Sequence, residues 1–109
     1  MSSEPSEYTI VITTCPNDEQ ATRLAAALLE KKLAACVQTS NIISTYRWKG
    51  GVETEKEVRL MIKAKRSDYD AIEAFIKSTH SYETPEVLAL PVIAGSQSYL
   101  DWIDGETRP

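Results

Sequence analysis

The chain of 109 residues carries a formal net charge of −4, and 42% of its residues are hydrophobic and 26% charged. This length and balance fit one globular domain, for which we expect a flexible tail over residues 1–7 and a single domain over residues 8–109. The acidic charge argues against nucleic-acid and anionic-membrane partners, since both need a basic face. No stretch approaches the ~20 apolar residues of a membrane span. We expect no secretory signal in the polar first six residues, and the two cysteines, in no CxxC spacing, favour a reduced, cytoplasmic protein.

The first elements are predicted from a β-branched run and a capped apolar repeat. Residues 8–14 favour a strand, either buried on both faces or with Tyr8, Ile10 and Ile12 inward. Asn17, followed three residues later by Gln20, has the spacing of a helix N-cap. The helix it begins should end near Lys31-Lys32. Its apolar face comprises Ala21, Leu24, Ala25 and Leu28.

From Cys36 to Lys65 the sequence predicts a hairpin too long for its own domain. Thirteen residues run in to Trp48, a Lys49-Gly50-Gly51 turn follows, and fourteen residues run out. At about 3.3 Å per residue each arm would reach roughly 43 Å, whereas a compact chain of this length is only about 34 Å across. The tip must therefore project. It carries apolar side chains that would be exposed to solvent in a monomer, so we expect an obligate oligomer.

The second half repeats the strand–helix–strand order. Alternation from Val58 to Lys65 indicates a strand with one buried face. Ser67, with Asp70 three residues on, is the expected N-cap of a second helix, whose apolar face comprises Ile72, Phe75, Ile76 and Thr79. An apolar strand should span residues 87–93, with Pro91 at an edge, a bulge or the strand's end. A short helix over residues 96–103 closes the chain. The order βαββαβ plus a helix predicts a ferredoxin-like α+β fold.

Five motifs in this order resemble the CutA family of divalent-cation tolerance proteins. They are Leu33-Ala34-Ala35-Cys36-Val37, Tyr46-x-Trp48-x-Gly50, Glu57-Val58-x-Leu60-x-Ile62-Lys63, His80-x-Tyr82-Glu83-x-Pro85-Glu86 and Tyr99-Leu100-x-Trp102-Ile103. The resemblance covers residues 8–103. It implies a tight homotrimer whose long hairpins interlock at their sheet edges, similar in architecture to PII-type signalling trimers that bind small ligands between subunits. It also implies a role in tolerance to copper and other divalent cations.

The candidate metal ligands are His80, Cys15 and Glu83. A neutral imidazole can bind Cu²⁺ or Zn²⁺ with help from a thiolate or a carboxylate. The resemblance points the same way, because family members are described as binding copper through Cys and His, although here Thr13 and Thr14 end the first strand and Cys15 follows it. The alternative is a loop histidine bonded to backbone. The family usually has Pro after this histidine, and the Ser81 found here should leave the loop less rigid.

Four further residues are candidates for a ligand cleft. Lys63 could hold an anionic ligand or pair with Glu57 or Glu86. Tyr82, with the carboxylates that follow it, marks the rim of this cleft or an interface loop. Tyr46, Trp48 and Trp102 are predicted subunit-interface residues, since interfaces favour aromatics that have a polar handle. Stacking of Tyr46 and Trp48 on a planar ligand is the alternative.

Three classes of function remain to be compared. A metal-responsive or ligand-binding trimer without turnover is the first, and a structural or signalling trimer with no metal role of its own is the second. An enzyme is not expected. The acylphosphatase-type chemistry of this fold needs an anion cradle with an arginine after the first strand, and Thr13-Thr14-Cys15-Pro16 supplies none. A lone histidine also leaves no Ser/His/Asp arrangement to argue from.

Overall fold

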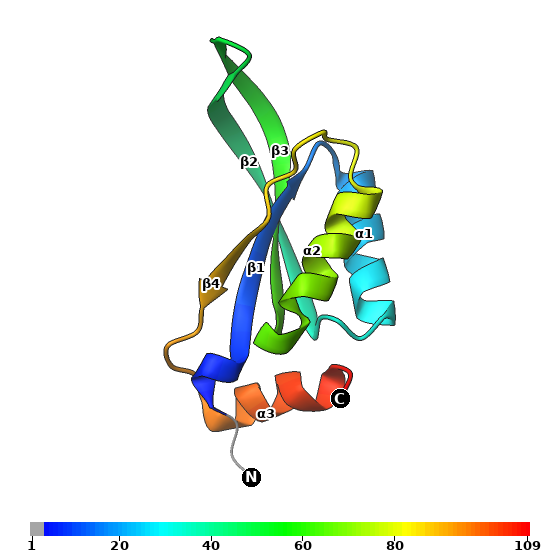
Figure 1. Ribbon diagram of the computed structural model, residues 1–109, viewed down its shortest axis with the longest axis vertical. Helices are drawn as coiled ribbons and strands as arrows, with labels where there is room; N and C mark the ends of the chain where they lie inside the picture. The colour runs from blue at the N-terminus through cyan, green and yellow to red at the C-terminus, as the bar shows by residue number, and fades with distance from the viewer. Residues whose placement is uncertain (1–3) are drawn as a thin grey trace.

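A four-stranded antiparallel sheet in the order β2-β3-β1-β4 forms the frame of the chain. The computed structural model describes residues 4–109. Two helices lie side by side on one face of the sheet, and the third crosses the end of the sheet opposite the hairpin tip (Figure 1). The elements are β1 (Tyr8–Cys15), α1 (Asp18–Glu30), β2 (Cys36–Trp48), β3 (Gly51–Lys65), α2 (Tyr69–Thr79), β4 (Leu88–Pro91) and α3 (Gln97–Glu106). The predicted ferredoxin-like α+β fold is confirmed. None of the helices within residues 4–109 is long and apolar enough to cross a membrane.

The core lies between the sheet and the helix pair. The alternation predicted for β3 is confirmed, because every second residue from Val58 to Ala64 is buried against α1 and α2. β1 has buried residues on both faces, which was the first of the two expected patterns. Val11 faces this core, while Tyr8, on the opposite face, is buried by Leu100 and Ile103 of α3. The C-terminal helix therefore builds a second, smaller core at the far end of the sheet.

The two main helices start differently. α1 begins as predicted, with the Asn17 side chain accepting a hydrogen bond from the Gln20 N–H at 2.9 Å. Ser67 is not the N-cap of the second helix. Residues Arg66–Asp68 form a 3-10 turn and α2 begins at Tyr69. Asp68 is the N-cap residue, but its side chain makes no capping bond. Its buried carboxylate instead accepts from Arg108 Nε and Nη2 of the C-terminal tail at 2.9 and 2.7 Å.

Several boundaries differ from the sequence expectation. The first strand includes Cys15, which was expected to follow it, and α3 continues to Glu106, beyond residue 103. Within the expected tail over residues 1–7, Pro5–Glu7 forms a turn of 3-10 helix that begins with Pro, whose fixed φ suits that position. Residues 1–3 lie outside the described residues. The last strand covers Leu88–Pro91 and is shorter than residues 87–93. Pro91 ends it at the sheet edge, as one of the alternatives required, because proline has no N–H for the ladder.

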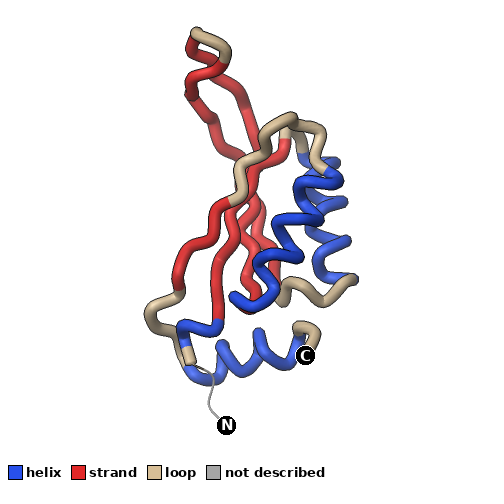
Figure 2. The backbone as a smooth tube through the Cα atoms, viewed as in Figure 1, coloured by secondary structure: helices blue, strands red, loops and turns tan. Residues whose placement is uncertain are grey.

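The hairpin projects beyond the rest of the sheet. Its ladder runs from Cys36 opposite Lys63 to Trp48 opposite Gly51, whereas β1 stops with Cys15 opposite Val58. Residues 51–57 of β3 thus pair with β2 alone, and the hairpin stands clear of the domain (Figure 2). The longest dimension of the chain is 51 Å, against 26 and 22 Å across.

The hairpin tip is a tight turn of two residues. Lys49 and Gly50 both have positive φ, 47° and 82°, the geometry of a type I′ turn that suits the twist of paired strands. Gly51, expected in the turn, is the first residue of β3.

Apolar side chains remain in water along both sides of this frame. Ile43 and Val52 on the hairpin are 71% and 67% exposed, and Ile93 after β4 is 90% exposed. The unpaired edges of β2 and β4 lie at opposite sides of the sheet. Exposed apolar surface next to open strand edges is typical of surfaces that another chain covers.

Removing the bonds between Arg108 and Asp68, the C-terminal clamp, should destabilise the fold. We expect Arg108→Ala to lower the free energy of unfolding by about 2 kcal/mol, because it strips two charge-assisted hydrogen bonds from a buried carboxylate. The control is Arg23→Ala, which removes an exposed pair with Glu19 and should cost less than about 0.5 kcal/mol. Equal losses for the two variants in urea unfolding would contradict the clamp.

Candidate functional site

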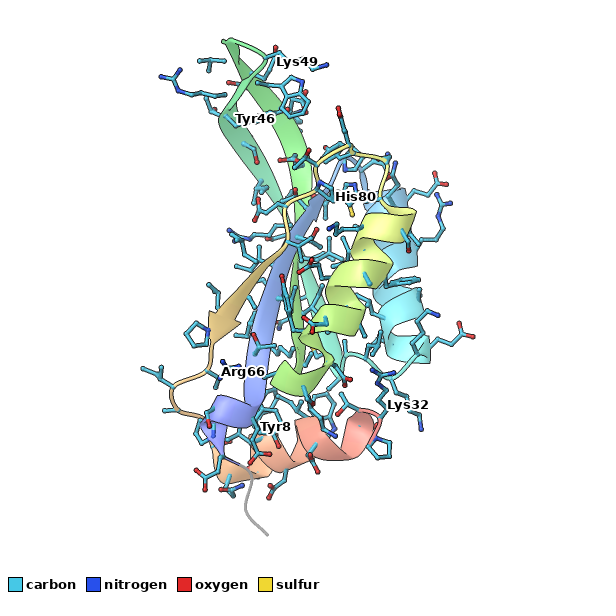
Figure 3. All side chains as sticks on the ribbon, in the orientation of Figure 1. Tyr8, Lys32, Tyr46, Lys49, Arg66 and His80 are labelled. Carbon is cyan, nitrogen blue, oxygen red and sulfur yellow. The ribbon has the colours of Figure 1, made fainter. Side chains whose placement is uncertain are left out.

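A cleft of about 620 Å³ lies between the projecting hairpin and the loop that follows α2. In Figure 3, Tyr46 marks the hairpin wall and His80 the start of the loop. A larger hollow of about 970 Å³ lies beside β4, but Arg66 and Asp70 are its only charged side chains. The hairpin cleft is the better candidate because it gathers more groups of one charge. Its lining comprises Thr14, Ser44, Tyr46, Arg47, Trp48, Glu55, Glu57 and residues 81–86.

The cleft is acidic and aromatic. Four carboxylates line it, two from β3 (Glu55, Glu57) and two from the loop (Glu83, Glu86), against one cation, Arg47. The three aromatic side chains are Tyr46, Trp48 and Tyr82. Such a lining attracts cations and repels anions.

A buried carboxylate forms the floor of this arrangement. Glu57 is only 8% exposed, and its Oε2 accepts a hydrogen bond from the Tyr82 hydroxyl at 2.9 Å. Burial, together with this bond and the charge of Glu57, raises the pKa of Tyr82 well above its usual value. No ion pair involves Glu57 among residues 4–109.

His80 fastens the loop to the sheet. Its Nε2 lies 2.6 Å from the Thr14 carbonyl oxygen and its Nδ1 lies 3.0 Å from the Tyr82 amide nitrogen. A carbonyl only accepts and an amide N–H only donates, so the ring is neutral with its proton on Nε2 and its lone pair on Nδ1. Both nitrogens are thus used within the chain. The structure agrees with the alternative of a loop histidine bonded to backbone.

Ser81 gives the loop another attachment in place of the family's usual proline. Its hydroxyl donates to Gln20 Oε1 on α1 at 3.0 Å. The expected loss of rigidity is therefore opposed by a contact that no proline could make.

The predicted metal centre is not assembled. Cys15 is 2% exposed on the helix side of β1, and burial, with the Glu57 charge second, raises its thiol pKa and disfavours the thiolate that a metal needs. His80 has no free nitrogen, and of the three proposed ligands only Glu83 lines the cleft. Across the described part of the chain, no three His, Cys, Asp or Glu side chains are grouped closely enough to hold a metal ion.

The predicted cleft residues are partly brought together. Glu57, Tyr82 and Glu86 line the cleft, as expected. Lys63 does not, because its Nζ bonds the Tyr99 hydroxyl at 3.1 Å and lies over that ring, at the end of the sheet where α3 packs. The expected pairing of Lys63 with a glutamate of the cleft is wrong. The Trp102 ring centre lies 5.6 Å from that of the same tyrosine, with the rings tilted, and Trp102 is exposed. Its interface role stays a prediction.

Two aromatic residues acquire a second role. Tyr46 and Trp48, predicted to hold a neighbouring subunit, also line the cleft of their own chain. The sequence reasoning missed Glu55 and Arg47 as lining residues. A signal for Glu55 was present, since it alternates with Glu57 and pairs with Ser44, which alternates with Tyr46. Finding Glu55 from the sequence would have required the length of the hairpin turn, because that length sets which residues of β2 and β3 pair.

Replacing Tyr82 should change stability in a pH-dependent way. Because the pKa of Tyr82 is raised from 10.0 by folding, its contribution is fully present below about pH 10 and is lost as pH rises through the higher folded value. At pH 7, Tyr82→Phe should cost about 2 kcal/mol, since Glu57 loses its donor. Above pH 10 the unfolding free energy of the original protein should fall more steeply than that of the variant. Tyr99→Phe, which removes a phenol hydroxyl bonded to Lys63 outside the cleft, is the control, and parallel pH profiles for all three proteins would contradict the assignment.

Comparison with known proteins matches nearly the whole chain. A family described as CutA1 divalent ion tolerance protein matches residues 9–106. The Divalent-cation tolerance protein CutA of Pectobacterium atrosepticum is 40% identical over 110 residues, covering 99% of this chain and 100% of that one. Protein CutA of Mus musculus is 44% identical over 105 residues, which cover 95% of this chain but 59% of the mouse protein. The chain thus spans little more than half of the mouse relative.

Solved structures agree with the fold. CutA1 from Shewanella sp. SIB1 superposes with a TM-score of 0.91 at 41% identity, covering 98% of this chain and 100% of that one. CutA1 from Oryza sativa gives a TM-score of 0.92 at 41% identity over 97% of this chain and 98% of that one. The resemblance seen in the five motifs is therefore confirmed, and the chain belongs to the CutA1 divalent ion tolerance protein family.

Proposed function

We propose that this protein acts in the response to divalent cations, copper among them, as a homotrimer without catalytic turnover. Membership of a divalent-cation tolerance family supports the general role. The observation that carries the specific proposal is the hairpin cleft, where four carboxylates face one arginine. A field of this sign concentrates cations, and carboxylate oxygens are suitable ligands for divalent ions.

The side chains that are not engaged in other bonds determine how a divalent cation would be bound. The imidazole of His80 and the thiol of Cys15 do not fit a metal in this chain, for the reasons given above. The exposed carboxylates of Glu83 and Glu86 on the loop are the groups that would hold a cation, weakly and with water completing its coordination. A second subunit could add further ligands to this rim.

The trimer is supported by the surfaces that one chain leaves open. The hairpin has no third strand beyond Val58, and the edge strands β2 and β4 both leave backbone groups for pairing. The exposed apolar residues of the hairpin and of the segment after β4 would be covered when such edges meet. We also propose a cytoplasmic location, because Cys15 and Cys36 are both free thiols.

A second function deserves a test because of His80. A histidine whose two nitrogens hold a loop contributes structure and leaves no metal ligand. This favours the alternative of a structural or signalling trimer with no metal role of its own. The two functions differ in whether the cleft carboxylates bind Cu²⁺ at all.

The trimer predicts a definite mass. Light scattering should give three times the 12.1 kDa of one chain. Ile93→Asp should shift the mass towards the monomer, because it places a charge in surface that the partner covers. Leu29→Asp on the helix layer, where the side chain is also partly exposed, is the matched control and should leave the mass unchanged. A stable monomer of the original protein would refute the trimer.

Copper binding should depend on the loop carboxylates and not on the histidine. In calorimetric titration of metal-free protein with Cu²⁺, we expect the double variant Glu83→Gln, Glu86→Gln to bind at least roughly tenfold more weakly. His80→Ala should stay within about twofold of the original affinity if the loop keeps its fold, which amide exchange would check. Equal, weak binding in all three proteins would favour the trimer with no metal role.

A further inference from the structure

The loop between α2 and β4, residues 80–87, contains no helix or strand. Its first three side chains attach it to the rest of the chain, His80 to β1, Ser81 to α1 and Tyr82 to β3. The same loop carries two of the four carboxylates of the cleft, Glu83 and Glu86. The position of these carboxylates therefore depends on the bonds of the three residues before them.

The bonds of His80 depend on its protonation state. Its Nε2 donates to the Thr14 carbonyl oxygen at 2.6 Å, and its Nδ1 accepts from the Tyr82 N–H at 3.0 Å. A further proton can add only at Nδ1, since Nε2 already carries one. Once protonated, Nδ1 becomes a donor that faces another donor, and the bond to the Tyr82 N–H is lost. The observed contact thus requires a neutral ring.

Tyr82 connects this histidine to the floor of the cleft. Its ring centre lies 4.7 Å from that of the imidazole, and its hydroxyl donates to Glu57 at 2.9 Å. Two N–H groups that point at each other across 3.0 Å repel, so the backbone of residue 82 must move when the ring is charged. Such a movement also pulls the Tyr82 hydroxyl away from Glu57. Two of the three attachments of the loop are therefore broken by one proton.

Ionisable groups on every element packed against His80 bear on this proton. No ion pair among residues 4–109 involves the imidazole. Carboxylates outnumber cations around it, so a charged ring has counter-charges to approach once it leaves its neutral contacts. These groups are Cys15 on β1, Asp18 and Glu19 at the start of α1, Lys77 at the end of α2, Glu55, Glu57 and Arg59 on β3, and Tyr82, Glu83 and Glu86 on the loop.

We propose that His80 is a pH-sensitive latch, which holds the loop on β1 while its ring is neutral and releases it when Nδ1 takes up a proton. Imidazole groups usually change charge between about pH 5 and 8, so release should occur in mildly acidic conditions. The loop then carries Glu83 and Glu86 away from the cleft. The latch goes beyond the proposed function, because it needs neither a bound metal nor a second subunit.

A single histidine makes the latch directly measurable. His80 is the only histidine of the 109 residues, so ¹H–¹⁵N NMR of imidazole nitrogens reports its tautomer and its charge alone. We expect the Nε2–H tautomer at about pH 8 and a charged ring at about pH 5. After correction for the intrinsic pH dependence of exchange, the Tyr82 amide should lose protection by roughly tenfold or more between these pH values. The amide of Val11, in the core, should keep its protection.

The matched control is His80→Asn. The Oδ1 of asparagine lies where Nδ1 of histidine does and can accept from the Tyr82 N–H, but it does not titrate. We expect Tyr82 protection in this variant to change less than about twofold over the same pH range. Because the neighbouring carboxylates titrate in both proteins, the difference between them reports the imidazole.

Four results would overturn the proposal. They are a ring that stays neutral at about pH 5, a charged ring with unchanged protection of Tyr82, a loss of protection that includes Val11, and an equal response in His80→Asn. The first three are measured on the original protein and decide the question even if the variant does not fold. All measurements use metal-free protein, so a failure of the copper experiment leaves this outcome unaffected.

Discussion

The paired strands β2 and β3 extend well beyond the end of β1, and most features of this protein depend on that difference in length. β1 ends at Cys15, opposite Val58, while the hairpin continues to its turn at Lys49 and Gly50. Beyond Val58, towards the turn, no described residue adds a third strand to the hairpin. Its side chains there face residues 16–18 at the start of α1, near Ile42 and Lys56, on one face and the loop after α2 on the other. The cleft forms where the loop meets this face, and the exposed apolar surface lies further out.

Contacts from three elements hold the loop in place. His80 reaches the Thr14 carbonyl at the end of β1, Ser81 reaches Gln20 on α1, and Tyr82 reaches Glu57 on β3. These bonds occupy the imidazole of His80 in holding the loop. The side chains that line the cleft are therefore mainly carboxylates and aromatic rings. The four carboxylates of the lining give the cleft a field that favours cations over anions. A tightly chelated metal would need ligands that this arrangement has already used.

The parts that were predictable are those governed by neighbours in sequence. Asn17 caps α1 because its side chain needs only an amide three residues away, and β3 buries alternate residues because strands have a period of two. Ser67 is not the cap of α2, since Asp68 takes that position and its carboxylate bonds to Arg108, forty residues later, instead of to the helix. Likewise Lys63 was expected near Glu57 or Glu86, but α3 brings Tyr99 to it instead. Such long-range pairs leave no local pattern to find.

The sequence by itself determined the order of elements, the length of the hairpin and the family, because repeats, turn residues and ordered motifs carry that information locally. Tertiary structure alone decided which side chains share a site. It placed Tyr46 and Trp48 beside Glu57 and Tyr82 within one chain, occupied both nitrogens of His80 and buried Cys15 away from the cleft. The physical reason is that these contacts join β1, the β2–β3 hairpin and the loop after α2, which lie far apart in sequence, and their geometry is set by the strand register and by packing of the core.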